Sequence, residues 1–161
     1  MFNKTKINNL QKGFTLLEVI IIIIIIGIIS SIILVSLSSF KNEQILKNTS
    51  IDVVSLLNKA RQNTLSSINS KNYGVHFETN KMVLFGGQSY SQLDISNEIV
   101  IFSPAILIPS LNGLNIGGGS DVIFDRLTGE TIGGTIILQL SSDNTKMKII
   151  TISKTGIISS N

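Results

Sequence analysis

One long apolar run near the N-terminus constrains the fold most. Residues 14–37 read FTLLEVIIIIIIIGIISSIILVSL and contain a single charged side chain, Glu18. As an α-helix rising about 1.5 Å per residue, this run spans roughly 36 Å, and a bilayer core is about 30 Å thick. In lipid the backbone must satisfy its own hydrogen bonds, so a helix is favoured despite the β-branched isoleucines. We therefore expect one membrane-spanning helix over residues 14–39.

The charges that flank the run predict its orientation. Lys4, Lys6 and Lys12 precede it, and no acid occurs before Glu18. Basic residues before a span favour a cytoplasmic N-terminus, which places the C-terminal domain on the outer side of the inner membrane. The alternative is a secretory signal cleaved at the small residues 36–38. Signal h-regions are about 7 to 15 residues long, however, and the apolar run here is far longer.

Composition narrows the function classes. The net charge of +3 comes from the first thirteen residues, and the rest of the chain carries 10 basic and 10 acidic side chains. Overall basicity therefore gives little support to nucleic-acid binding. The absence of cysteine excludes a disulfide framework, a thiolate metal site and a cysteine nucleophile, and a single histidine, His76, disfavours histidine chemistry. We expect no catalytic residues, no metal and no cofactor, and hence no enzyme.

Glu18 is the exception inside the apolar run. An acid at mid-membrane costs about 2.5–3.5 kcal/mol even on a lenient insertion scale, so its presence needs a reason. One reading places Glu18 at the level of the cytoplasmic headgroups, where it costs little. In the other reading, the Glu18 carboxylate pairs with a cation inside an apolar assembly. Its position alone leaves both readings open.

The residues around Glu18 carry a family resemblance. The segment 12–19 reads KGFTLLEV, after a short basic leader and before the apolar run. This combination resembles the N-terminus of type IV prepilins and pseudopilins. The resemblance implies that residues 1–13 are a leader and that a prepilin peptidase cleaves between Gly13 and Phe14. It also implies that the same enzyme N-methylates the Phe14 amine and that Glu18 is the fifth residue of the mature chain.

Cleavage would give Glu18 a partner. The new ammonium at Phe14 lies four residues before Glu18, roughly 6 Å along a helix axis. In a staggered helix bundle, the Glu18 of one subunit can meet the Phe14 ammonium of its neighbour. Such a pair sets the register, since either charge would be costly to bury alone. Gly27 and Ser30-Ser31 interrupt the isoleucines, either as tolerated small residues or as points of close helix approach.

A 3.6-residue period continues beyond the apolar run, from Phe40 to about Ile68. The apolar positions of its stripe are Leu46, Val53, Val54, Leu57, Ala60, Leu65 and Ile68. This pattern predicts an amphipathic continuation of the same helix over residues 40–70, packed on a second element. Residues 69–72 are typical of a helix end.

Period-two patterning over residues 71–161 predicts a β-rich domain. Residues 73–77 and 81–85 form a hairpin signature, and 135–141 is expected to pair antiparallel with 147–153. Further strands are expected at 98–102 and 121–124, with a short closing strand at 157–158. The predicted fold class is α+β, a long N-terminal helix packed on a C-terminal antiparallel sheet. Residues 122–157 are also similar to the C-terminal half of GspH/FimT-type minor pseudopilins. Major pilins of the Gram-negative type usually carry a C-terminal disulfide loop, so within this resemblance the missing cysteines favour a pseudopilin or a minor pilin.

Three other features are candidates for functional sites. His76 alternates out of phase with its apolar neighbours, so a surface or structural role is expected. The glycine-rich stretch 112–121 lacks the continuation of a phosphate-binding loop and is expected to be a flexible connection. Asp121, Asp125 and Glu130 could be proposed as calcium ligands, but their spacing does not match an EF-hand loop.

The leading hypothesis is a structural subunit of a type II secretion pseudopilus or a type IV pilus-like filament. Its expected partners are a prepilin peptidase, other pilin or pseudopilin subunits, the inner-membrane assembly platform and the membrane itself. The alternative is a DNA-uptake pilin of a competence machine, which needs a basic β domain. Residues 71–161 carry six basic and seven acidic side chains, so DNA is an unlikely partner. A third hypothesis is a signal-anchored surface protein without a filament role.

Overall fold

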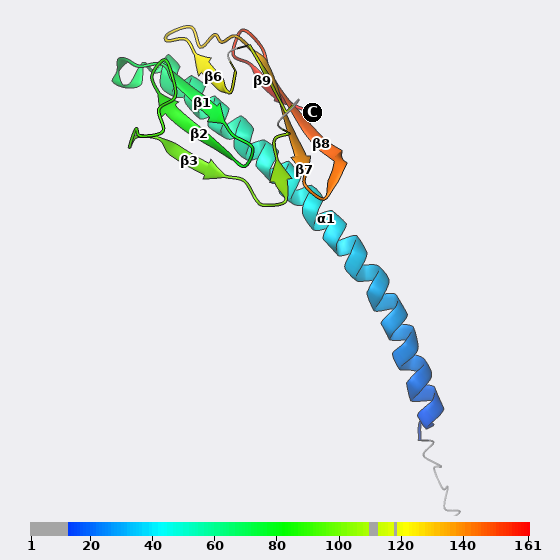
Figure 1. Ribbon diagram of the computed structural model, residues 1–161. Helices are drawn as coiled ribbons and strands as arrows, with labels where there is room; N and C mark the ends of the chain where they lie inside the picture. Colours follow the sequence, from blue (N-terminus) through cyan, green and yellow to red (C-terminus); the bar gives the residue numbers. More distant parts are fainter. Residues whose placement is uncertain (1–12, 110–112, 118) are drawn as a thin grey trace, which may run out of the picture. The chain divides into compact units, whose positions relative to one another are not determined.

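The computed structural model describes residues 13–109, 113–117 and 119–161, and for residues 32–36 and 38 it describes the backbone alone. The chain divides into two compact units, one ending at Ser39 and the other comprising Phe40–Asn161. Helix α1 (Leu16–Leu65) contributes to both units. In the described part of the chain, the first unit consists of the early turns of α1, and the second combines the later turns with the strands β1 to β9. Figure 1 shows α1 and most of these strands.

In the second unit, α1 buries one face against the sheets. Its buried positions recur every three or four residues, as the 3.6-residue period requires. They are Leu46, Thr49, Ser50, Val53, Leu56, Leu57, Ala60 and Thr64. The expected stripe is confirmed at Leu46, Val53, Leu57 and Ala60, whereas Val54 is only partly buried.

The prediction is wrong for the last two positions of the expected stripe, which are not buried. Leu65 is 38% exposed and Ile68 is 42% exposed. The helix ends at Leu65, before the end expected for the segment 40–70, because Ser67 adopts the left-handed conformation with φ of 50°. A short 3-10 helix, η1 (Ile68–Ser70), follows and turns the chain toward the first strand.

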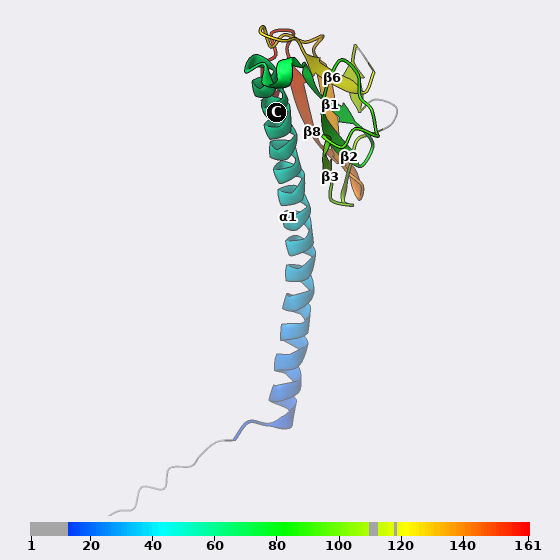
Figure 2. The same ribbon diagram turned by 90° about the vertical axis from the view of Figure 1, so that its left-hand side faces the viewer.

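The first sheet has four antiparallel strands in the order β3-β2-β1-β6. They are β1 (Tyr73–Phe77), β2 (Lys81–Gly86), β3 (Glu98–Ile101) and β6 (Asp121–Phe124). The expected hairpin is confirmed as β1 and β2, with Val75 opposite Leu84. The sheet lies on one side of α1, with β1 and β2 at its centre (Figure 2).

The second sheet has five strands in the order β4-β7-β8-β9, with β5 also paired to β7. They are β4 (Ile106–Leu107), β5 (Leu114–Ile116), β7 (Gly134–Leu140), β8 (Asp143–Ile152) and β9 (Ile158–Ser160). The expected antiparallel pair is confirmed as β7 and β8, with Ile136 opposite Ile150. The strand β8 begins at Asp143, four residues earlier than expected. The pairing register shifts within β7, since Gln139 lies opposite Met147 whereas Leu140 lies opposite Asp143.

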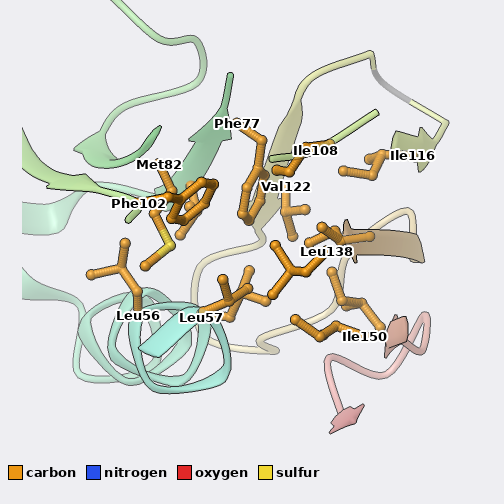
Figure 3. Close-up of a cluster of buried hydrophobic side chains, with 14 of the residues drawn as sticks. Leu56, Leu57, Phe77, Met82, Phe102, Ile108, Ile116, Val122, Leu138 and Ile150 are labelled. Carbon is orange, nitrogen blue, oxygen red and sulfur yellow. The ribbon is translucent and has the colours of Figure 1, made fainter. Parts of the chain in front are cut away.

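The core lies between α1 and the two sheets. Figure 3 shows Leu56 and Leu57 of the helix facing Met82 and Phe77 of the first sheet and Leu138 of the second. Each of these five side chains is at least 94% buried. One continuous apolar cluster therefore joins helix and sheets, and its burial is the main contribution to the stability of this unit. The α+β class and the helix-on-sheet arrangement are as the sequence predicts.

The other face of the first sheet is covered by a loop rather than by the helix. Phe85 points to this face and lies across Gly74, its cross-strand partner. A Cβ on Gly74 would lie 2.8 Å from the Phe85 ring and 2.7 Å from the Val122 carbonyl oxygen. Tyr90, from the β2–β3 connection, packs its ring edge-on to Phe85. The glycine thus lets an aromatic side chain close this face.

Candidate functional site

The predicted processing site lies directly before the helix. Gly13, Phe14 and Thr15 precede α1, which begins at Leu16. Phe14 is 79% exposed, and a Cβ on Gly13 would have no atom within 4 Å. The helix starts two residues later than the sequence predicts, so Phe14 precedes its first turn. The Gly13–Phe14 bond therefore lies outside the helix, where a peptidase can reach a peptide bond more readily.

Thr15 caps the start of α1. Its hydroxyl oxygen Oγ1 accepts a hydrogen bond of 3.2 Å from the Glu18 N–H, and its carbonyl accepts one of 3.2 Å from the Val19 N–H. The first contact satisfies an amide group that the first turn of a helix otherwise leaves without a partner, and the second is the first regular hydrogen bond of the helix. This capping role of Thr15 is not among the roles expected from the sequence. The spacing of Thr15 and Glu18, which is that of a capping box, could have predicted it.

Glu18 is exposed and lies in the first turn of α1. A carboxylate at this position interacts favourably with the positive end of the helix dipole. Among the residues that the structure describes, Glu18 has no cation within ion-pairing distance. It is also the only charged residue between Phe14 and Phe40. Its charge is therefore available to a cation from another molecule.

The helix around Glu18 exposes apolar surface on every side. The large apolar side chains from Leu16 to Ile29 are each 44–78% exposed. Soluble monomers rarely leave so large a contiguous apolar surface uncovered, and a helix that is apolar all round is normally buried. Gly27 leaves open space where a Cβ would be, while Ser31 Oγ donates a 2.7 Å hydrogen bond to the Ile28 carbonyl. This segment is built to be covered by other apolar groups.

Within the part of the chain that the structure describes, no helix is found that is long and apolar enough to span a membrane. The transmembrane helix expected over residues 14–39 stays a prediction. That range includes 32–36 and 38, whose side chains lie outside the described residues.

His76 belongs to a small polar cluster on the outer face of the first sheet. Its Nδ1 lies 2.5 Å from Asp121 Oδ1 on the neighbouring strand, and its ring stacks on Tyr90 with centroids 4.0 Å apart. Glu78 Oε1 lies 3.7 Å from His76 Nε2 and 3.0 Å from Lys81 Nζ. These contacts tie the β2–β3 connection to the sheet, which is a structural role.

The three acids considered for calcium have separate surroundings. Asp121 faces His76, whereas Asp125 and Glu130 lie in the turn after β6, where the Asp125 N–H donates to the Glu130 carbonyl at 2.7 Å. Among the described residues, no group of three histidine, cysteine or acidic side chains could hold a metal ion. Residues 112 and 118 of the glycine-rich stretch 112–121 lie outside the described residues. The stretch includes the short strand β5.

Comparisons with known proteins agree with these observations. Residues 8–34 match the family described as the prokaryotic N-terminal methylation motif. The comparison with curated proteins gave no significant match.

Two solved structures have a similar fold. One is the minor pseudopilin EpsH from the type 2 secretion system of Vibrio cholerae, with a TM-score of 0.55 and 12% identity over 72% of this chain and 95% of that one. The other is the type IV minor pilin FimU of Pseudomonas aeruginosa, with a TM-score of 0.56 and 10% identity over 76% of this chain and 92% of that one. The chain thus carries the prokaryotic N-terminal methylation motif at residues 8–34 and has a fold similar to the folds of these two proteins.

Proposed function

We propose that this chain is the precursor of a structural subunit in a type II secretion pseudopilus or a type IV pilus-like filament. The observation that carries the proposal is the methylation motif over residues 8–34, which includes the exposed apolar turns of α1 from Leu16 to Ile29. A prepilin peptidase removes residues 1–13 and methylates the new amine of Phe14. The two similar structures are minor subunits, one from each kind of machine, so the proposal covers both.

Before assembly, the apolar half of α1 is held in the inner membrane. The basic residues of the leader keep its N-terminus in the cytoplasm, and the β domain lies on the outer side. Assembly then moves the helix from lipid into a bundle of equivalent helices, which cover the same apolar surface. An inner-membrane platform and a separate ATPase supply the work, because the role of this chain is structural.

Glu18 sets the register of that bundle. Contacts between isoleucines are non-directional and allow many axial offsets, whereas a buried charge tolerates only the offset that gives it a partner. The Phe14 ammonium of a neighbouring subunit is that partner. Support comes from the exposure of Glu18 and from the absence of any other charge between Phe14 and Phe40.

The test replaces Glu18 in the full chain, in cells that contain the peptidase and the filament machinery. Glu18→Gln keeps the size of the side chain and the hydrogen bonding of a capping box but removes the charge. We expect normal processing and strongly reduced incorporation into sedimented filaments, and the same result for Glu18→Ala. Incorporation of Glu18→Gln equal to that of the wild type would show that the charge does not set the register.

A further inference from the structure

A groove of about 380 Å³ opens at the beginning of the second unit. One wall is formed by the first turns of α1 in this unit, and the other by the start of β8. Its lining residues are Phe40, Glu43, Gln44, Leu46, Lys47, Thr145, Lys146, Met147 and Lys148. The contact between the Lys146 ammonium and the Glu43 carboxylate joins the two walls.

The groove combines apolar and basic surface. Leu46 is buried beside it, while Phe40 remains 60% exposed. An exposed phenyl ring at the groove offers a surface that an apolar group can cover.

Two of the three lysines in the groove carry uncompensated charge. Glu43 is the only acid in the lining, and it is already paired with Lys146; as the acceptor of its hydrogen bond, Glu43 raises the pKa of Lys146. Lys47 and Lys148 have no acid within ion-pairing distance among the residues the structure describes. The groove therefore presents two free ammonium groups to an anion.

The position of the groove in the chain points to the source of the anion. Phe40 directly follows Ser39, the last residue of the apolar unit. If that unit lies in a bilayer, as proposed above, the groove lies at the bilayer surface. Aromatic and lysine side chains are suited to this depth, because the apolar parts enter the acyl region while the ammonium groups reach the headgroups.

We propose that this groove binds the headgroup of an anionic phospholipid, with Lys47 and Lys148 on the phosphate and Phe40 against the acyl chains. The bound lipid holds the β domain at the membrane surface before assembly. The inference rests on the proposed membrane storage of the precursor. Nucleic acid also carries phosphate, but it offers no acyl group for the exposed phenyl ring, so the lipid is favoured.

The test uses the full chain in phosphatidylcholine vesicles with and without phosphatidylglycerol. Because the chain has no cysteine, Gln44→Cys allows one fluorophore to be attached at the wall of the groove. Quenching by a lipid with a nitroxide headgroup, present in both leaflets, then reports contact between groove and headgroups. We expect phosphatidylglycerol to increase the quenching about twofold or more.

A matched pair of variants identifies the residues responsible. Lys47→Gln with Lys148→Gln is expected to abolish the response to phosphatidylglycerol. Lys71→Gln with Lys154→Gln removes the same charge elsewhere in the β domain and is expected to keep it. Equal loss in both double variants would overturn the proposal in favour of a diffuse charge effect.

Two further outcomes are decisive. Binding of short duplex DNA that depends on Lys47 and Lys148, without any response to phosphatidylglycerol, would overturn the lipid assignment. Retention of the chain in vesicles after an alkaline wash separates this inference from the proposed function. A chain that is washed off contradicts membrane storage and the inference with it, whereas a retained chain without a lipid response contradicts the inference alone.

Discussion

At the scale of single residues, the start of α1 gives two neighbouring side chains different tasks. Thr15 organises the first turn through its hydroxyl oxygen, and Glu18 contributes its backbone N–H to that turn while its carboxylate stays exposed. The cap is a local property of one chain, whereas the carboxylate needs a second molecule. Variants of Thr15 should therefore weaken the first turn of the helix, whereas variants of Glu18 should reduce assembly with other subunits.

Thr15→Ala tests the cap. Removing the hydroxyl should cost about 1 kcal/mol at the first turn, which corresponds to roughly fivefold faster exchange of the Glu18 amide hydrogen. Hydrogen exchange of the full chain in detergent measures this change. Thr15→Ser keeps a capping oxygen and should exchange at nearly the wild-type rate. Unchanged exchange in Thr15→Ala would mean that the Thr15 hydroxyl does not hold the turn.

Gly156 is a second residue with a strict backbone requirement. Its φ is 77°, and a Cβ would lie only 2.1 Å from the Gly129 carbonyl oxygen. Gly87 also has a positive φ, of 140°, but its nearest atom would be 3.8 Å away. Both alanine variants share the backbone strain, and only the one at Gly156 adds a backbone clash.

We therefore predict that Gly156→Ala lowers the melting temperature of the β domain much more than Gly87→Ala does. The difference should correspond to about 2 kcal/mol or more, since the clashing atom is part of the backbone and cannot turn away. Both tyrosines of the chain, Tyr73 and Tyr90, lie in the second unit, so near-ultraviolet circular dichroism reports its unfolding. Equal melting temperatures for the two variants would contradict the close approach.

At the scale of elements, Thr64 joins the end of α1 to the beginning of β1. Its buried hydroxyl donates a 2.9 Å hydrogen bond to the Ala60 carbonyl and accepts one of 2.9 Å from the Tyr73 N–H. Thr64→Val keeps the volume but leaves the Tyr73 amide without this partner. We expect a loss of about 1–3 kcal/mol in the free energy of unfolding.

Thr151→Val, an exposed position on β8, serves as the matched control for Thr64→Val. A surface substitution of this kind should change the free energy of unfolding by less than about 0.5 kcal/mol. Chemical denaturation of the full chain in detergent measures both variants. A similar effect of the two substitutions would exclude a specific role for the hydroxyl of Thr64.

The elements that the sequence predicts best are those with a sustained apolar pattern. Apolar residues alternate along β1 and run without interruption through residues 82–85 of β2, and the pairs β1–β2 and β7–β8 form as expected. The strands β4 and β5 were missed because they have only two and three residues, too few to show a period. Long-range pairing with β7, rather than local pattern, makes them strands.

The helix end was misplaced for a different reason. Leu65 and Ile68 continue the apolar spacing, so the pattern alone extends the helix beyond its end. The left-handed backbone of Ser67 and Asn69 terminates the helix instead, and short polar side chains tolerate that conformation without making it obligatory. The same limitation applies to His76, whose partner Asp121 is distant in sequence and is brought close only by the pairing of β1 with β6.

At the scale of the whole molecule, the two units differ in how far their apolar side chains are exposed. The second unit buries its apolar side chains in a core of its own, whereas the first leaves them exposed along the helix. The sequence predicts this contrast, since a change from an unbroken apolar run to a 3.6-residue period marks the change of environment. The partner that covers the first unit is not encoded in any single chain.

The most direct measurement is the mass of the N-terminus of the protein isolated from its native cells. We predict a chain that begins at N-methylated Phe14, and we expect Gly13→Ala to retain the leader. The added methyl group meets no atom within 4 Å, so any effect of Gly13→Ala arises at the peptidase and not in the fold. A mature chain that still begins at Met1, or one that begins beyond Ser38, would contradict the account.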